Sequence, residues 1–246
     1  MTENHPFEIV QDVELAAAPE RIWKAVTDDT AAWMFPTDQW PAVRTVDERP
    51  AHLVTRMEGP DGWFNQLEHV ITAGPDGAHL HYVHSGVLTD NWEQQYDGAA
   101  KHTAFYLHTL GEYLTHFDGR AVVFVDVQGP DGATAPDAFE AFLASFGLSG
   151  VIPGEKKDLD VPGLGPVEAT VDYANEYFLG LRTADAMVRV FGRNLLGDRV
   201  GLTVHDFSLG SGDSVGGGTT ADDAARTALA DHHAAAWGAY LGKLYA

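Results

Sequence analysis

Two groups of polar and aromatic residues have spacings that could place them around one binding pocket. Four of them alternate as on one face of a β-strand: Trp63, Asn65, Leu67 and His69. Five more recur at helical spacing: His102, Phe105, Tyr106, Thr109 and Tyr113. Ligand pockets are mostly apolar with a few fixed polar groups, and this mixture could supply both. The alternative is that the aromatic residues are core, and that His69 and His102 are hydrogen-bonded inside the protein or face solvent.

Three of these side chains could also carry acid–base chemistry. His69, His102 or Tyr113 could polarise a bound carbonyl group or remove a proton from the molecule that carries it. Carboxylates that could assist occur at five positions: Asp12, Glu14, Glu58, Glu68 and Asp90. Acid–base catalysis needs two groups with shifted pKa values, and no pair of carboxylates stands out. Because the chain also lacks cysteine, we predict no catalytic residues.

Three histidines between His79 and His84 have a spacing that suggests a metal site. The imidazoles of His79 and His81 would share one face of a strand and could bind Zn²⁺ together, whereas His84 would face the other way. A third ligand would have to come from another part of the chain: Glu68, Glu93 or His205. We therefore predict neither a metal ion nor another cofactor.

Turn signals divide the first half of the chain into elements that could hold these residues. Alternating apolar residues over 7–15 predict a strand, Pro19-Glu20 opens a short helix, and a second short helix ends at Pro36. Turns rich in Gly, Pro and Asp then separate three antiparallel strands: residues 51–58, 63–71 and 78–87. Apolar residues at helical spacing after Asp97-Gly98 predict a long helix that ends at Phe117.

The second half of the chain repeats this order. Residues 121–125 predict a strand, and Ala135-Pro136-Asp137 opens a short helix. Residues 147–166 are rich in Gly, Pro and charge and predict a loop. Three further strands are predicted: residues 167–181, 186–191 and 199–208. The glycine-rich residues 210–218 predict a flexible tether, and a last helix begins at Thr220 or Asp222.

Similar helix ends indicate an internal duplication. Leu110-Gly111-Glu112-Tyr113-Leu114 resembles Trp237-Gly238-Ala239-Tyr240-Leu241 near the C-terminus. The strand residues Leu80-His81-Tyr82-Val83-His84 are likewise echoed by Leu202-Thr203-Val204-His205 before the final helix. A matching order of strands and helices with matching ends is typical of a tandem repeat. We predict two units that divide the chain near its middle: residues 1–118 and 119–246.

Composition narrows the classes of partner. Fifteen Lys and Arg against 36 Asp and Glu give a net charge of -21, which repels nucleic acid and anionic membrane surfaces. We therefore expect neither as a partner, and a solvated acidic surface explains the charge. The polar N-terminus and the lack of a long apolar run predict no signal peptide and no membrane span. With no cysteine to need an oxidising compartment, we expect a cytoplasmic protein.

Three stretches of the first half resemble a known superfamily: Ala18-Pro19-Glu20-Arg21-Ile22-Trp23, Ala32-Trp33-Met34-Phe35-Pro36 and Leu110-Gly111-Glu112-Tyr113-Leu114. Together with the order of elements, they look like the START-like, or SRPBCC, superfamily. Within it they most resemble bacterial relatives of the C-terminal domain of the activator of the 90-kDa heat-shock protein ATPase. The resemblance covers residues 7–117 well and the second half weakly. It implies an α+β helix-grip fold, in which an antiparallel sheet wraps around a long C-terminal helix.

The resemblance also implies a function. Members of this superfamily bind small hydrophobic molecules in a cavity between the sheet and the long helix, so we expect a small apolar ligand there. Polyketide cyclases and dehydratases with this scaffold suggest an enzyme as an alternative. The heat-shock relatives suggest a stress-associated protein with a chaperone as partner. This sequence shows no counterpart of their separate N-terminal activator domain. The resemblance alone therefore does not imply that this protein stimulates a chaperone.

Overall fold

The chain forms two compact units, Met1–Asp118 and Gly119–Ala246. The computed structural model describes residues 5–88, 92–210 and 220–246. Most of the predicted tether, residues 211–218, lies outside the described residues. None of the described helices combines the length and the apolar sequence needed to cross a membrane.

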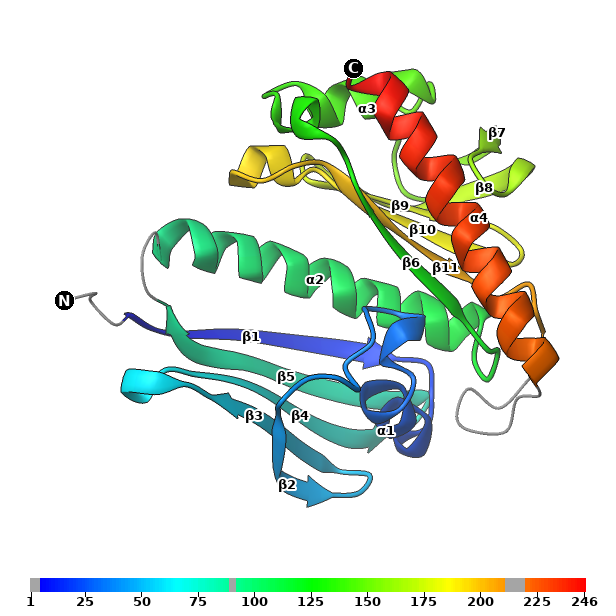
Figure 1. The fold of residues 1–246 in the computed structure, drawn as a ribbon. Helices are drawn as coiled ribbons and strands as arrows, with labels where there is room; N and C mark the ends of the chain where they lie inside the picture. Colours follow the sequence, from blue (N-terminus) through cyan, green and yellow to red (C-terminus); the bar gives the residue numbers. More distant parts are fainter. Residues whose placement is uncertain (1–4, 89–91, 211–219) are drawn as a thin grey trace. The chain divides into compact units, whose positions relative to one another are not determined.

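Unit 1 is built from a five-stranded sheet, one long helix and short helical segments (Figure 1). Its strands are β1 His5–Leu15, β2 Val43–Glu48, β3 His52–Glu58, β4 Phe64–Gly74 and β5 Gly77–Leu88. Its helical segments are α1 Pro19–Thr27, η1 Thr30–Ala32, η2 Pro60–Gly62 and α2 Trp92–His116. The strand order is β1-β5-β4-β3-β2, and every neighbouring pair is antiparallel.

Alternation along the strands separates the two faces of this sheet. In β1, Ile9 and Leu15 are buried while Glu8, Asp12 and Glu14 are exposed, because successive side chains point to opposite faces. Helix α2 packs along β1 and β5 and is visible as the long green helix beside the sheet (Figure 1). The α+β fold predicted from the sequence, an antiparallel sheet with a long terminal helix, is confirmed.

Helix α1 begins and packs as its sequence predicts. Pro19 occupies its first position, where the missing N–H costs no hydrogen bond, and Glu20 lies near the positive end of the helix dipole. Ile22, Trp23 and Val26 form its buried stripe against α2 and the sheet. The segment that follows α1 turns back through η1 and forms part of the site described below.

Unit 1 contains one strand that was not predicted, and its long helix begins earlier than predicted. Strand β2 was not predicted, because it is an edge strand whose residues are mostly exposed and whose last residues resemble a turn. Helix α2 begins at Trp92, so Asp97 and Gly98 lie inside it instead of before it. The helix tolerates the weak helix former Gly98, and an ion pair between Asp97 and Lys101 one turn later supports it.

Unit 2 has the same order of elements with one additional strand (Figure 1). Its strands are β6 Val123–Gln128, β7 Lys156–Val161, β8 Gly165–Ala174, β9 Phe178–Arg182, β10 Ala186–Phe191 and β11 Gly201–Asp206. Its helical segments are η3 Asp131–Thr134, α3 Ala138–Ser145, η4 Arg193–Leu196 and α4 Thr220–Leu244. The antiparallel strand order is β6-β11-β10-β9-β8-β7, so the last strand again lies beside the first.

The structure corrects two predictions in unit 2. The predicted loop over residues 147–166 contains β7, an edge strand in which charged exposed residues alternate with the buried Leu159 and Val161. The single strand predicted over 167–181 is two strands, β8 and β9. They are separated by a turn in which Asn175 Oδ1 accepts hydrogen bonds of 2.8 Å from the N–H groups of Tyr177 and Phe178.

The interior of unit 2 is filled by side chains. Four aromatic rings from α3, its C-terminus and α4 pack against one another: Phe142, Phe146, Trp237 and Tyr240. Phe142 and Trp237 belong to an apolar core that also includes Val125 and Val188 from the sheet. Phe146 and Tyr240 are partly buried and pack against this core.

Candidate functional site

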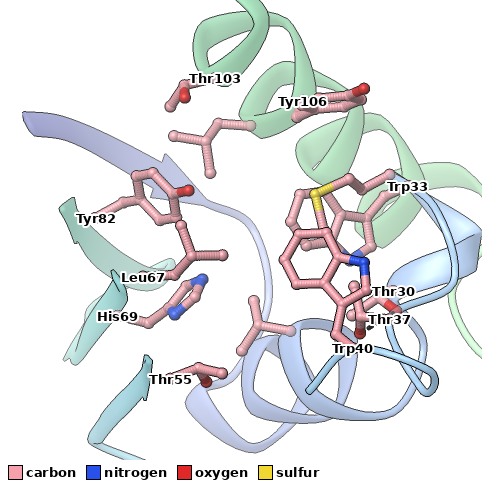
Figure 2. A pocket seen from close by; sticks show the side chains of 13 residues that line it. Thr30, Trp33, Thr37, Trp40, Thr55, Leu67, His69, Tyr82, Thr103 and Tyr106 are labelled. Atoms are coloured by element: carbon pink, nitrogen blue, oxygen red, sulfur yellow. Dashed lines mark hydrogen bonds between the residues drawn. The ribbon is translucent and has the colours of Figure 1, made fainter. Parts of the chain in front are cut away.

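A small cavity lies inside unit 1 between the sheet, helix α2 and the segment that follows α1 (Figure 2). Its volume is about 70 Å³. Helix α2 contributes Thr103, Tyr106 and Leu107 to the lining. None of the lining residues is Asp, Glu, Lys or Arg, so the cavity is lined by uncharged groups and one histidine.

The sheet provides one wall of this pocket. Thr55, Leu67, His69 and Tyr82 come from β3, β4 and β5 and point from the strands into the cavity (Figure 2). Their arrangement follows from strand register, because Thr55 pairs with Leu67 and His69 pairs with Tyr82. Paired residues share a face of the sheet, so all four belong to the face turned towards α2.

The opposite wall is aromatic. Trp33 and Trp40 from the segment after α1 lie across the cavity from the sheet residues, with Tyr106 above them (Figure 2). Phe35 holds this wall together, since its ring centroid lies 5.3 Å from that of Trp40 and 5.8 Å from that of Tyr106. The hydroxyls of Thr30 and Thr37 are 3.0 Å apart and close the segment into a loop.

His69 is the chemically unusual group in the pocket. Only 4% of the residue is exposed, and its Nδ1 atom is buried without a hydrogen-bond partner. Burial lowers the pKa of His69 to about 4, because the charged imidazolium would lose its hydration. The ring is therefore neutral at neutral pH. The ring makes an edge-to-face contact with Tyr82, with ring centroids 5.0 Å apart.

Tyr82 is also kept in its neutral form. Burial raises the pKa of its hydroxyl, and a hydrogen bond with Thr103 has a smaller effect in the opposite direction. Neither His69 nor Tyr82 therefore presents a charge to the cavity near neutral pH. The pocket can bind apolar surface and form a few neutral hydrogen bonds, but it has no fixed charge with which to hold an ion.

Three of the nine predicted pocket residues border this cavity: Leu67, His69 and Tyr106. Trp63 precedes β4 and is 37% exposed. Asn65 Oδ1 lies 2.7 Å from Nε2 of His84 near the end of the same strand. Neither residue is among those that line the cavity.

The other four predicted residues are on α2 and point elsewhere. Nδ1 of His102 lies 2.7 Å from the carbonyl oxygen of Gly98. Thr109 donates a hydrogen bond of 2.9 Å to the carbonyl oxygen of Phe105, and both residues are buried away from the pocket lining. The hydroxyl of Tyr113 donates to Oδ2 of Asp29 at 3.2 Å. The bonds of His102 and Thr109 lie within α2, the bond of Tyr113 links α2 to Asp29, and none of the four residues borders the cavity.

Several lining residues were missed by sequence reasoning. Tyr82 could have been found from strand register, because it lies opposite His69 on the next strand. Thr103 lies one turn before Leu107 and shares its face of α2. Trp33 and Trp40 belong to an irregular segment whose path has no periodic signal, although Trp33 lies in a motif singled out above.

Two of the three histidines of β5, His79 and His81, contact carboxylates on the outer face of the sheet. Nε2 of His79 and Nδ1 of His81 each lie 2.9 Å from Oδ1 of Asp12, and Nδ1 of His79 lies 3.0 Å from Oε1 of Glu14. The hydrogen bonds from His81 and His79 lower the pKa of Asp12, and those with Glu14 and Asp12 raise the pKa of His79. Within the described ranges, no three His, Asp or Glu side chains are arranged to hold a metal ion.

A second, larger depression lies on unit 2. This open groove of about 630 Å³ is bordered by β7, β8, the β9–β10 turn and α4. Asp206 lies at its edge, where its Oδ2 atom is 2.7 Å from Nε2 of the buried His233. Burial opposes ionisation of Asp206, but hydrogen bonds from His233 and Ser208 outweigh it and keep its pKa below the ordinary value. The groove is lined by charged residues such as Glu168 and Arg182 together with apolar ones such as Val167 and Leu229.

Comparison with known proteins gives structural likenesses only. No family model and no curated protein matches the sequence. Protein MLL2253 from Mesorhizobium loti shares 18% identity, with 46% of this chain and 99% of that chain covered and a TM-score of 0.39. DynU16, from the dynemicin biosynthetic locus, shares 19% identity over 96% of this chain and 97% of its own, with a TM-score of 0.36.

A third likeness is to the Aha1 dimer from Colwellia psychrerythraea. It shares 15% identity, with 44% of this chain and 96% of that chain covered and a TM-score of 0.36. At these identities and TM-scores, the similarity concerns the backbone path and assigns neither a family nor an activity to this chain.

Proposed function

We propose that unit 1 binds a small, mainly apolar molecule in the cavity between its sheet and α2. The observation that carries this proposal is an uncharged lining of aromatic and aliphatic groups around a buried histidine whose Nδ1 has no partner. A few oriented polar groups in an apolar cavity are what small-molecule sites have in common. The sequence resemblance to START-like proteins, and to bacterial relatives of the heat-shock ATPase activator, supports the same function.

Binding is a better proposal than catalysis. A cyclase-like reaction would require His69, His102 or Tyr113 to act on a common substrate, and only His69 borders the cavity. The hydroxyl of Tyr113 donates a hydrogen bond to Asp29, and His102 contacts the carbonyl oxygen of Gly98. A chaperone partner stays a prediction from the sequence resemblance, because no feature of the described surface favours it.

The test uses the full chain and a ligand panel. Native mass spectrometry and thermal shift with fatty acids, sterols and small aromatic compounds should show a bound complex and a higher melting temperature. Fluorescence should report occupancy as well, because Trp33 and Trp40 line the cavity. If no member of the panel binds at millimolar concentration, the proposed function is wrong.

A pocket-filling variant locates the binding site. Thr55→Phe places a ring in the cavity from the sheet wall and should abolish binding while circular dichroism stays unchanged. Thr72→Phe is the matched control, since Thr72 is exposed on β4 and points away from the pocket. Binding that survives Thr55→Phe, or that is lost equally in both variants, would place the ligand elsewhere.

A further inference from the structure

We propose that the molecule bound in unit 1 is a small uncharged aromatic compound with one hydrogen-bond-accepting oxygen, held by the Nε2–H group of His69. This inference rests on the proposed function and specifies the chemistry of its ligand. Three features of the pocket support it: its lack of charge, the state of the His69 ring, and the arrangement of its two walls.

The lack of charge selects a neutral ligand. A carboxylate or ammonium group moved from water into this cavity would lose its hydration and meet no Asp, Glu, Lys or Arg side chain in exchange. The histidine does not compensate, because its ring is neutral unless the solution is strongly acidic. Fatty-acid anions and amino acids are therefore poor ligands for this site.

The His69 ring fixes the polar group of the ligand. Its Nδ1 atom is sealed from solvent without a partner, so Nε2 is the ring nitrogen that a ligand can reach. A neutral imidazole carries one proton, and a proton on the sealed Nδ1 would leave a buried donor unsatisfied. A proton on Nε2 leaves an unpaired lone pair on Nδ1 instead, which proteins tolerate better because orphaned buried N–H groups are rarer than under-satisfied acceptors. We therefore assign the proton to Nε2, which then requires an acceptor such as a carbonyl oxygen.

The other polar groups of the lining are already engaged or less buried. Tyr82 and Thr103 form a hydrogen bond with each other, and so do Thr30 and Thr37. Thr55 is only half-buried. His69 is therefore the polar group of the lining that a hydrogen bond with a ligand would stabilise most.

The walls and the volume select the shape of the ligand. The rings of Trp33, Trp40 and Tyr106 face the sheet residues across a narrow space, which suits a flat molecule (Figure 2). A dry cavity of about 150 Å³ is known to hold benzene, and this one measures about 70 Å³. The cavity is therefore less than half that size, and an aromatic ring enters it only if the half-buried Met34 and Trp40 move outward.

Three compounds test these features separately. Acetophenone has one ring and one carbonyl oxygen, α-methylstyrene replaces that oxygen by a methylene group, and benzoate carries a charge. Titrations followed by tryptophan fluorescence and calorimetry should show acetophenone binding about three- to tenfold more tightly than α-methylstyrene, the usual range for one hydrogen bond. Benzoate should bind most weakly.

Two variants connect the difference to His69. His69→Phe keeps a ring of similar shape and should abolish the preference for acetophenone while α-methylstyrene still binds. His84→Phe is the matched control, because burial also lowers the pKa of His84 to about 4 but its Nε2 already contacts Asn65 outside the pocket. The preference for acetophenone should persist in this control.

The outcomes separate this inference from the proposed function. Equal binding of acetophenone and α-methylstyrene, or a preference for benzoate, would overturn the inference and leave the binding function intact. A preference for acetophenone that survives His69→Phe would assign the recognition to another group and overturn the role of His69. If none of the three compounds binds and the wider panel also fails, both proposals are wrong.

Discussion

The indole Nε1–H of Trp33 donates a hydrogen bond of 2.8 Å to the carbonyl oxygen of Ala25. Ala25 lies in the last turn of α1, where carbonyl groups have no partner within the helix. The same ring forms part of the aromatic wall of the pocket. One side chain therefore both completes the end of α1 and positions the surface that a ligand would contact.

Trp33→Phe should lower stability and weaken ligand binding together. The variant keeps an aromatic ring but leaves the Ala25 carbonyl without its donor, which costs about 1–2 kcal/mol in the free energy of unfolding. Urea denaturation measures this loss, and fluorescence titration measures the affinity. Trp63→Phe is the control, because Trp63 is 37% exposed and should change neither quantity. A Trp33→Phe protein with unaltered stability would show that the hydrogen bond is unimportant.

His69→Phe should change the pH dependence of stability. The pKa of His69 is about 4 in the folded protein, below its ordinary value of 6.5, so between these values the unfolded chain binds a proton that the folded one does not. Stability is therefore lost as the pH falls from about 6.5 to 4. For one such histidine, the loss between pH 7 and pH 5 is about 2 kcal/mol.

The His69→Phe variant should lose the part of the pH dependence of stability that His69 contributes and should keep the rest. His84 has the same depressed pKa of about 4 and contributes in the same direction, so the remaining protein should still weaken in mild acid. Urea unfolding at pH 7 and pH 5 measures both slopes. An unchanged slope in His69→Phe would mean that His69 is protonated in the folded protein at pH 5.

Tyr113→Phe should affect stability without affecting the pocket. The hydroxyl of Tyr113 donates to Asp29, whose side chain is only 2% exposed and also pairs with Lys24 at 3.1 Å. Loss of this donor should cost about 1–2 kcal/mol in the free energy of unfolding. Because Tyr113 does not border the cavity, ligand affinity should stay within twofold. A larger loss of affinity in a folded variant would show that Tyr113 takes part in ligand binding.

Gly163→Ala should destabilise unit 2 more than Gly165→Ala. Both glycines have left-handed backbone angles, with φ of +80° and +73°, so alanine costs each about 1–2 kcal/mol. A Cβ atom at Gly163 would in addition overlap Nδ1 of His233 and disturb its contact with Asp206, whereas one at Gly165 would meet no atom within 4 Å. Denaturation of the two variants side by side measures the difference. Equal losses would show that the His233 ring moves aside freely.

Periodic elements with one buried face could be predicted from the sequence. Strand β10 was predicted with its observed bounds, and α1 was predicted from Pro19 and its apolar stripe. The edge strands β2 and β7 could not be predicted, since their exposed residues resemble loops. Their strand conformation depends on hydrogen bonds to a neighbouring strand that only the folded sheet provides.

The residues of the site could be predicted only in part, because several of them come together only in the folded protein. Leu67 and His69 were found because alternation along one strand is visible in the sequence. Tyr82 required the register between β4 and β5, and Trp40 required the path of an irregular segment. On α2, the aromatic residues Phe105 and Tyr106 looked equivalent, yet only Tyr106 borders the cavity, because rotation of one residue around a helix changes the face.

The two units follow the same order of elements but surround different interiors. In unit 1 the side chains between sheet and helix leave a small uncharged cavity, whereas in unit 2 Phe142 and Trp237 belong to an apolar core against which the partly buried Phe146 and Tyr240 pack. What such a unit encloses is therefore decided by its side chains and not by its backbone topology. A protein engineer could alter the contents of either unit by exchanging side chains while the order of strands and helices stays the same.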